Sequence, residues 1–379
     1  MRSLRLLVVV STLVALACSG LESAPDPGLS VEQITKLVRK DVQEKLPWAQ
    51  AVRAGLVAAR RVPDEDHACQ VLAVIEQESG YEADPEVPGL AKIVMSELEA
   101  EAQEKIGFLG PAAVGMLLDV TPEGEAKSFR QRLEKVRTER DLDRLFRDMQ
   151  AYHAAKAPRL AKALDILAPR LRERLNPIST AGSMQVSVSF ALDQASAEDL
   201  DPAAIRERLY TIDGGVLYGT LRLFVHEAAY TAPVYRFADY NAGVFASRNA
   251  AFQGLVRDLV GAELNPDGDL LIWNDRGKPT DTDGQTMRAL LSWRASLAAD
   301  LPEQQIRRDV RREKELGFES TETWRRVRQS WTSKKGTEPA YAALPDVALD
   351  SPKLRKDRTT RWFAESVERR YRDCLKRNG

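Results

Sequence analysis

The sequence is poor in cysteine and histidine and carries no excess of charge of either sign. Its 379 residues include three cysteines and three histidines, and 55 Lys and Arg face 56 Asp and Glu to leave a net charge of −1. This balance gives no broad basic field, so no nucleic-acid partner is expected. With 44% hydrophobic and 29% charged residues, the composition excludes collagen-like, disordered and polytopic membrane proteins.

Long apolar runs are also scarce, and the clearest lies at the N-terminus. Residues 6–17 form an apolar segment behind Arg2 and Arg5. The segment is too short to span a bilayer, and a short basic stretch before such a core is typical of a signal peptide. The sequence therefore predicts an exported protein.

The apolar segment ends in Ala15-Leu16-Ala17-Cys18, which resembles the lipobox of bacterial lipoproteins, with Ala15 where that motif usually has Leu. The resemblance implies a lipid on Cys18 as the sole contact with a membrane. Because Ser19 rather than Asp follows, it also implies an outer-membrane location facing the periplasm. Ordinary cleavage after Ala17, with an incidental Cys18, is the alternative.

Helical periodicity with polar caps dominates from residue 30 onward, whereas alternating strand patterns are scarce. We therefore expect an all-α fold, or nearly so. The expected division is a leader over 1–17, a tether over 18–29, a domain over 30–260 with a helical insertion at about 86–176, and a C-terminal helical extension over 261–379.

Two cysteines remain after the leader, Cys69 and Cys374. Disulfides persist in an oxidising compartment, so an exported chain allows a bridge that would tie the C-terminus to an early helix. Two unpaired buried thiols are equally compatible with the sequence, because it does not give the Cα separation that a bridge needs.

A carboxylate lies on the apolar face of one predicted helix. Residues 64–79 have an acidic first turn and an apolar stripe that includes Val71 and Ile75, and Gly80 is a stop signal. Extending the stripe by three places reaches Glu78. Burial disfavours the ionised carboxyl and raises its pKa, which suits a general acid at neutral pH. A cap or a salt bridge at the helix end is the alternative role.

Three motifs, in order along the chain, resemble those of the lysozyme-like lytic transglycosylases. Residues 74–81, Val-Ile-Glu-Gln-Glu-Ser-Gly-Tyr, resemble the segment in which a catalytic Glu-Ser ends a buried helix. Residues 179–186, Ser-Thr-Ala-Gly-Ser-Met-Gln-Val, resemble the Gly-Leu-Met-Gln element, and residues 238–243 resemble the Tyr-Asn-Ala-Gly element. The resemblance implies a lysozyme-like helical catalytic core over about residues 64–259.

The resemblance also implies roles for single residues. An amide such as that of Gln185 can bond sugar hydroxyls, and Tyr240 offers an aromatic face with a hydroxyl. A glycine turn before a buried segment and a helix cap with a core tyrosine are the alternatives. Glu78 is the implied catalytic residue, and the implied substrate-binding residues are Ser79, Met184, Gln185, Tyr240 and Asn241.

The chain departs from the family's pattern in two places. The connection from Glu78 to Met184 is far longer than usual, because residues 86–176 lie between them, and this block is expected to form a lid or a groove wall. Ser183 stands where the family commonly has Leu. Residues 235–252 further resemble an uncharacterised family of proteobacterial lipoproteins.

The implied activity is cleavage of peptidoglycan glycan strands between N-acetylmuramic acid and N-acetylglucosamine. In the family that the motifs resemble, one Glu protonates the bridging oxygen and then directs the muramic C6 hydroxyl onto C1, which leaves a 1,6-anhydro end without cofactor or metal. Hydrolysis stays open. Ordinary glycosidases need a second carboxylate, and Asp84 and Asp239 are candidates, although turn and helix roles explain them more simply. The alternative is a non-catalytic envelope lipoprotein that binds peptidoglycan or a cell-wall protein.

Other site patterns are incomplete. Residues 226–230 begin like a zinc-protease helix but lack the second imidazole. His67 and Cys69 offer two ligands without a matching second pair. Gly214 and Gly215 precede an apolar helix without the Lys of a phosphate loop, so close packing explains them. We therefore expect no metal site.

Overall fold

The computed structural model describes residues 28–158, 176–195, 200–274, 277–348 and 358–378. The expected leader, the lipidation residue Cys18 and nearly all of the tether lie outside these residues. Within them the chain is mostly helical, and the strands are confined to one two-stranded hairpin, so the all-α expectation is confirmed. No helix of the described part is long and apolar enough to cross a membrane.

Helices begin where the sequence supplies caps. At the start of α1 (Val31–Leu37), the Ser30 hydroxyl accepts from the Gln33 amide and the Gln33 side chain accepts from the Ser30 amide, which makes a capping box. Asp64 caps α3 (Glu65–Glu78) by accepting from the amide of His67 at 2.8 Å.

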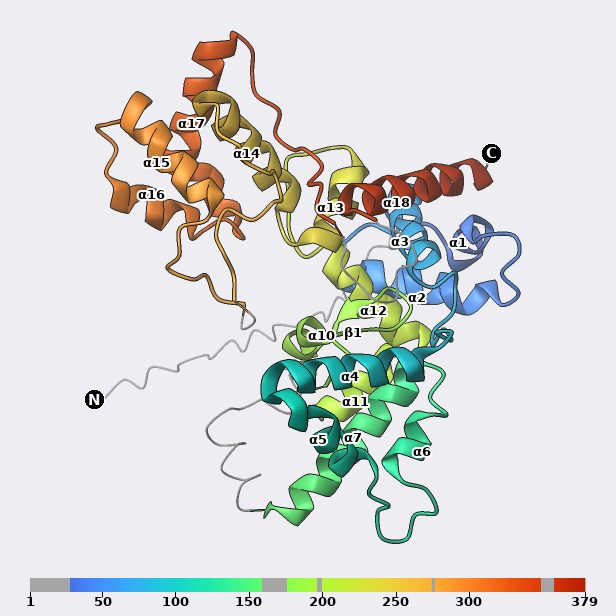
Figure 1. Ribbon diagram of the computed structural model, residues 1–379. Coiled ribbons are helices and arrows are strands. Elements are labelled where there is room, and N and C mark those ends of the chain that lie inside the picture. The colour runs from blue at the N-terminus through green and yellow to red at the C-terminus, as the bar shows by residue number, and fades with distance from the viewer. Residues whose placement is uncertain (1–27, 159–175, 196–199, 275–276, 349–357, 379) are drawn as a thin grey trace, which may run out of the picture.

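One large core joins the N-terminal helices to the middle of the chain (Figure 1). Leu56, Leu72 and Val216 are fully buried in it. Gly55 permits a close helix pair, because a Cβ there would lie 2.8 Å from the Thr220 hydroxyl. Around this first core lie α1, α2 (Lys45–Ala58), α3, α10 (Val188–Ala195), α11 (Pro202–Leu209), α12 (Ile212–Leu223) and α13 (Pro233–Ala242).

The expected insertion forms a lobe at the lower end of the molecule in Figure 1. Its described helices are α4 (Leu90–Ile106), η1 (Gly107–Leu109), α5 (Gly110–Leu118), α6 (Phe129–Leu133) and α7 (Glu139–Lys156). Residues 159–175 of the expected insertion lie outside the described part. Buried side chains of the lobe, such as Leu142 and Leu145, belong to the same core as α3, so the lobe is joined to the rest of the first core.

A second core lies in the upper lobe of Figure 1. Phe252 stacks on Trp324 with ring centroids 5.4 Å apart, and the Phe318 ring meets the Phe252 ring edge-on with centroids 5.2 Å apart. The helices of this second core are α14 (Ala246–Val260), α15 (Gln285–Leu297), α16 (Glu303–Val310), η3 (Leu316–Ser320) and α17 (Glu322–Lys335).

The C-terminal helix α18 (Thr360–Leu375), followed by η4 (Lys376–Asn378), returns to the first core and packs on α3 and α13. A disulfide joins Cys69 on α3 to Cys374, with Cα atoms 5.6 Å apart. The structure thus corrects the expected division at residue 260. The helix α14 before that point belongs to the second core, and α18 after it belongs to the first, because each buries its apolar stripe there.

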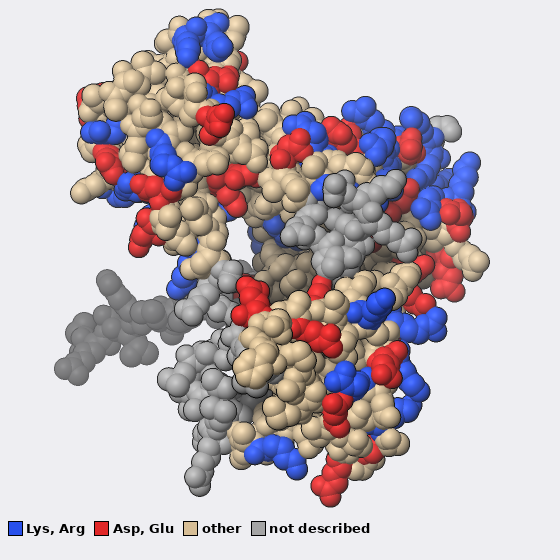
Figure 2. Space-filling model, in the orientation of Figure 1, with Lys and Arg blue, Asp and Glu red and all other residues tan. Residues whose placement is uncertain are grey.

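The surface carries both charges. On the face in Figure 2, Lys and Arg gather at the end of the molecule where Figure 1 places α18, and elsewhere the two signs alternate. Several of these cations are paired, since Arg372 lies 2.8 Å from Glu368 and Arg377 lies 3.0 Å from Glu76. The Arg377–Glu76 pair is largely buried, whereas Arg372 is exposed, and exposed pairs contribute little to stability.

Candidate active site

Glu78 is the last residue of α3 and lies half-buried at the edge of the first core, whereas Leu72 and Ile75 on the same helix are fully buried. Ser79 follows as the C-cap, and its hydroxyl donates to the Ile75 carbonyl at 3.1 Å. The proton of the Ser79 hydroxyl is therefore used within the helix, and only the oxygen lone pairs remain for a ligand.

A tight left-handed turn fixes the end of α3. Gly80 has φ 63° and Tyr81 has φ 73°, a conformation that destabilises a non-glycine residue by about 1–2 kcal/mol. Tyr81 is buried, and its ring meets Trp48 edge-on with centroids 5.5 Å apart. This packing holds the strained turn in place and so positions Glu78.

The Glu78 carboxyl is desolvated and unpaired. It makes no hydrogen bond or ion pair with any other residue that the structure describes. Burial, and next the negative charge of Glu139, raise the pKa of Glu78 to about 8. At pH 7 most Glu78 side chains therefore keep their proton. This is the state that a general acid requires.

The second motif forms the hairpin of β1 (Thr180–Ala181) and β2 (Val186–Ser187), in which Ala181 pairs with Val186. Gly182, in the loop between them, has φ 79°, and a Cβ there would lie 2.1 Å from the Leu209 carbonyl oxygen. No other residue fits, because both the conformation and the space require glycine.

The same hairpin is docked on the glycines of α12. A Cβ at Gly215 would lie 2.8 Å from the Ser183 hydroxyl, and one at Gly219 would lie 2.3 Å from the Met184 sulfur. The close packing expected before the apolar helix is therefore confirmed. Met184 itself is fully buried, which corrects its predicted role in substrate binding. Its side chain fills the first core, and its carbonyl accepts from the Tyr240 hydroxyl at 2.6 Å.

Gln185 lies at the edge of the hairpin in a left-handed conformation, with φ 48°. Its side-chain oxygen accepts from the Thr180 hydroxyl at 2.9 Å, and its side-chain nitrogen donates to Glu139 at 3.1 Å. Glu139 is the first residue of α7 and is 6% exposed. The insertion therefore contributes directly to this site, by binding Gln185 and by raising the pKa of Glu78.

The third motif places Tyr240 beside Glu78. Burial, and next the charge of Glu78, raise the pKa of the Tyr240 phenol far above its ordinary value, so the hydroxyl stays protonated. Asn241 follows on α13 with an exposed side chain that bonds no other described residue. Its amide is free to bind a ligand.

Sequence reasoning missed two charged residues of the site, Glu139 and Arg222. Arg222 lies on α12, and its guanidinium carbon is 6.0 Å from the centroid of the Phe190 ring. Burial lowers the pKa of Arg222, and the negative charge of Asp239 opposes that shift. Glu139 comes from a charged stretch without a motif, and Arg222 is a single cation in an apolar run, so no signal along the chain marks either residue.

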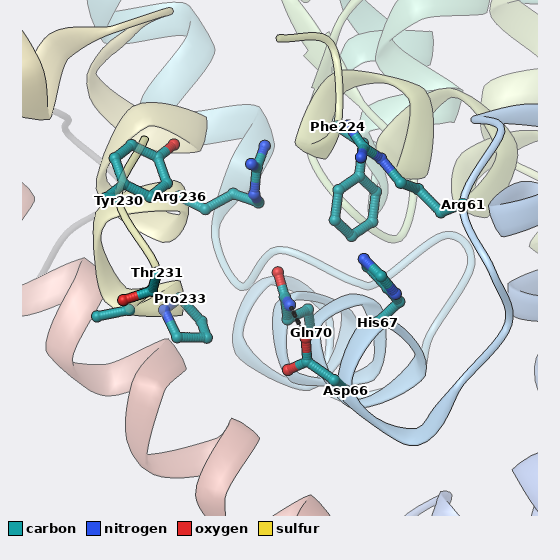
Figure 3. Close-up of a pocket in the computed structure, with 10 residues that line it drawn as sticks. Arg61, Asp66, His67, Gln70, Phe224, Tyr230, Thr231, Pro233 and Arg236 are labelled. Carbon is teal, nitrogen blue, oxygen red and sulfur yellow. Dashed lines mark hydrogen bonds between the residues drawn. The ribbon is translucent and has the colours of Figure 1, made fainter. Parts of the chain in front are cut away.

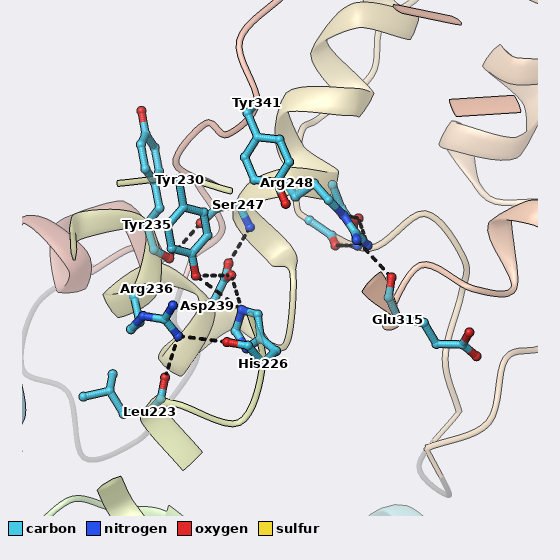
Figure 4. Close-up of polar contacts among 12 residues, drawn as sticks. Leu223, His226, Tyr230, Tyr235, Arg236, Asp239, Ser247, Arg248, Glu315 and Tyr341 are labelled. Atoms are coloured by element: carbon cyan, nitrogen blue, oxygen red, sulfur yellow. Dashed lines mark hydrogen bonds and ion pairs between the residues drawn. The ribbon is translucent and has the colours of Figure 1, made fainter. Parts of the chain in front are cut away.

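Both candidates for a second carboxylate are hydrogen-bonded, but the buried Oδ1 of Asp84 bonds no described residue. Asp84 accepts from the Thr138 hydroxyl at 3.1 Å, at the start of α7, and burial raises the pKa of Asp84. Asp239 is fully buried and accepts from the Ser247 amide at 2.6 Å and from His226 and Tyr230 at 3.0 Å each (Figure 4). Asp239 thereby joins α13 to α14, a structural role.

One cluster has the composition of a metal site. Asp64, Asp66 and His67 offer ligand atoms within 4.8 Å of one another. Asp64 is the cap of α3 and lies 2.9 Å from the Nδ1 of His67, while Asp66 accepts from the Tyr371 hydroxyl at 2.6 Å. A helix cap accounts for this arrangement, and Asp66 is exposed.

Comparison with known proteins gives a family but no activity. A model described as a protein of unknown function, DUF1615, matches residues 41–377. "Uncharacterized protein YaiW" of Escherichia coli (strain K12) is 34% identical over 382 residues, which cover 98% of this chain and 97% of that protein. No solved structure matches. Because the family model spans most of the chain and the relative nearly all of it, the chain belongs to the DUF1615 family.

Proposed function

We propose that this protein is an exported lipoprotein that cleaves peptidoglycan glycan strands between N-acetylmuramic acid and N-acetylglucosamine, with Glu78 as acid and then base. The observation that carries the proposal is a desolvated, unpaired carboxyl with a pKa of about 8 beside the Tyr240 hydroxyl. Perturbed carboxyls of this kind cluster at active sites. The lysozyme-like core is part of the same proposal.

In the proposed reaction, the Glu78 carboxyl gives its proton to the glycosidic oxygen as the bond from that oxygen to C1 of the muramic sugar breaks. The Glu78 carboxylate then takes the proton of the C6 hydroxyl as that oxygen bonds to C1. The proton balance closes, and Glu78 ends protonated. A hydroxyl of the same molecule has a high effective concentration, so it competes well with water.

The state of the other carboxylates favours this route over hydrolysis. A water-activating base has to be ionised and free to accept a proton. Asp239 accepts from three donors, and Glu139 accepts from the Gln185 amide. Asp84 keeps one oxygen without a described partner, but burial raises its pKa and so disfavours the ionised form. The anhydro product is therefore proposed over a reducing end. Tyr240 offers its hydroxyl oxygen near Glu78, because the hydroxyl proton is donated to the Met184 carbonyl.

Export is supported by the disulfide between Cys69 and Cys374, because such bridges persist in oxidising compartments. We propose lipid attachment at Cys18 and an outer-membrane location facing the periplasm. Radiolabelled palmitate should label the native chain in a Gram-negative host, and Cys18→Ser should abolish the label. Labelling that survives this substitution would contradict the proposed anchor.

A second candidate is a non-catalytic lipoprotein that binds peptidoglycan. It is favoured by the burial of Ser183 and Met184 and by the bonding of the Gln185 amide to Glu139, since these leave fewer groups for a sugar than the implied pattern offers. In that case Glu78 would contribute to binding without donating a proton.

Digestion of purified peptidoglycan separates the two candidates. The parent protein should release anhydromuropeptides, identified by mass spectrometry, while Glu78→Gln should release none and still sediment with the wall. Glu82→Gln is the matched control, because Glu82 is exposed and lies just beyond the same helix. Reducing-end products would indicate hydrolysis, and sedimentation without products from the parent would establish the binding protein.

A further inference from the structure

A second cavity lies at the other end of α3, beside residues that the proposed function does not use. It has a volume of about 150 Å³ and lies between the N-terminal half of α3, the end of α12 and the start of α13 (Figure 3). An engineered cavity of about this volume in another protein holds benzene. The space therefore suits a small organic molecule or the end of a chain.

Gln70 supplies an acceptor to this cavity. It is 5% exposed, and its side-chain nitrogen donates to the Asp66 carboxylate at 3.1 Å. A carboxylate only accepts, so the amide nitrogen must face Asp66 and the amide oxygen must face the other way. That buried oxygen has no partner among the described residues, and Figure 3 shows it directed toward the open space between Arg236 and His67.

Two guanidinium groups supply the positive charge. The Arg236 Nη1 donates to the carbonyls of Leu223 and His226 at 3.2 and 3.1 Å, and Arg236 has no carboxylate partner in the described part of the chain. Arg61 is ion-paired with Glu227 through one nitrogen, while its buried Nε bonds no described residue. An Arg Nε that is desolvated and unpaired is an expensive group to bury, and an anion would satisfy it.

Phe224 forms an apolar wall between the two cations. The guanidinium carbon of Arg61 lies 5.4 Å from its ring centroid and that of Arg236 lies 5.3 Å away. The His67 ring meets Phe224 edge-on at 5.3 Å. These contacts fix the rings and the cations in place, so the cavity is pre-formed and little ordering would accompany binding.

Donors for an anion and an acceptor for an N–H group thus line one small cavity. We propose that the cavity binds a carboxylate with an adjacent N–H group, as in a free α-amino acid or the C-terminal residue of a peptide. The carboxylate contacts Arg61 and Arg236, and the N–H group donates to the Gln70 oxygen. The proposal does not depend on cleavage by Glu78.

Isothermal titration calorimetry of the purified full chain tests this with four matched probes. Glycine represents the free amino acid and N-acetylglycine the peptide end, whereas acetate lacks the N–H group and glycinamide lacks the carboxylate. Glycine or N-acetylglycine should bind at least tenfold more tightly than acetate and glycinamide, and the tighter of the two identifies the source. Equal affinity for acetate, or no binding of either glycine compound, would overturn the proposal.

Variants assign the contacts. Gln70→Met keeps a similar volume and removes the acceptor. It should lower the affinity for the preferred probe at least tenfold, while the midpoint of thermal unfolding is retained. Arg61→Lys keeps the charge and removes Nε, and it should lower the affinity for the same probe. Glu78→Gln is the control, and it should bind the preferred probe with the same affinity as the parent protein. Unchanged affinity in both Gln70→Met and Arg61→Lys would refute the assignment.

Discussion

The two cores each contain a carboxyl whose pKa burial raises, and the two carboxyls differ in their partners. Glu313, in the second core, is fully buried, accepts from the Trp273 indole at 2.6 Å and from the Leu270 amide, and lies near the charge of Lys314. Its pKa is raised to about 7. Glu78, in the first core, has its pKa raised to about 8, and its carboxyl bonds no other described residue.

This contrast separates a structural carboxyl from a candidate reactive one. Glu313 holds the 270–273 segment against the chain after α16, and its oxygens are occupied. Glu78 lies at a half-buried edge with both oxygens free among the described residues, beside the Tyr240 phenol. A raised pKa alone is therefore no sign of catalysis, and the combination of a raised pKa with unoccupied oxygens is the informative feature.

The largest expected effect follows from exchanging each carboxyl for its amide. Glu78→Gln should lower glycan cleavage by about a thousandfold, because a general acid contributes that order of rate, and should raise the free energy of unfolding at neutral pH, because the amide does not ionise in the unfolded state. Glu313→Gln should leave cleavage unchanged and lower the free energy of unfolding by about 1–3 kcal/mol, because an amide cannot accept from both donors. Muropeptide release and urea denaturation measure the two effects, and the reverse pattern would contradict the contrast.

We expect the disulfide to stabilise the first core, which contains Glu78, and not the second core, which contains Glu313. Cys69→Ser with Cys374→Ser should lower the free energy of unfolding by about 2–5 kcal/mol, because the bridge closes a long loop and holds α18 on α3. Calorimetry with and without reductant measures this. Fluorescence of the second core's Trp293 and Trp324 should report little change in the native state. An unchanged midpoint on reduction would show that the bridge does not stabilise the fold.

Stability should decline with rising pH through Glu78. Its pKa in the native state, about 8, lies above its ordinary value of 4.5, so the native state binds the proton more tightly than the unfolded state. The resulting stability is full below about pH 4.5 and is lost as pH rises through about 8. Glu78→Gln should flatten the dependence of the free energy of unfolding on pH between pH 4.5 and 8, as measured by urea denaturation. An unaltered slope of free energy against pH would contradict the raised pKa.

Glu139→Gln should have a smaller effect on cleavage than Glu78→Gln. Removing the negative charge of Glu139 lowers the pKa of Glu78, so the loss of cleavage at high pH should move to lower pH. The pH profile of kcat/KM measures the shift, and Glu134→Gln, an exposed position of the same lobe, serves as control. A shift to higher pH would rule out the assigned interaction.

Tyr240→Phe is expected to have the smallest effect on stability. It removes one hydrogen bond to the Met184 carbonyl, which contributes about 0.5–1.5 kcal/mol. Cleavage should fall because the hydroxyl beside Glu78 is lost, whereas the same change at Tyr341, near the second core, should leave cleavage intact. Equal effects at both positions would indicate a general effect on folding.

Local patterns in the sequence predicted much of the first core. The start of helical periodicity at residue 30, the acidic first turn of residues 64–79 and the stripe ending at Glu78 are local signals, and they match α1, α3 and the desolvation of Glu78. The glycines before the apolar helix predicted close packing, which Gly215 confirms.

Contacts between distant segments could not be predicted. The bond from Gln185 to Glu139 and the return of α18 to α3 join residues that are far apart in the chain, and an amphipathic stripe does not specify its partner. Met184 was misassigned for the same reason, because its burial depends on the approach of α12.

The central claim is that the Glu78 carboxyl is protonated at neutral pH because it is desolvated and unpaired. NMR titration of the protein with ¹³C-labelled glutamate carboxyls, assigned by comparison with Glu78→Gln, measures this directly. We expect the Glu78 resonance to titrate near pH 8, apart from the exposed glutamates. A midpoint near the ordinary value of 4.5 would contradict the account.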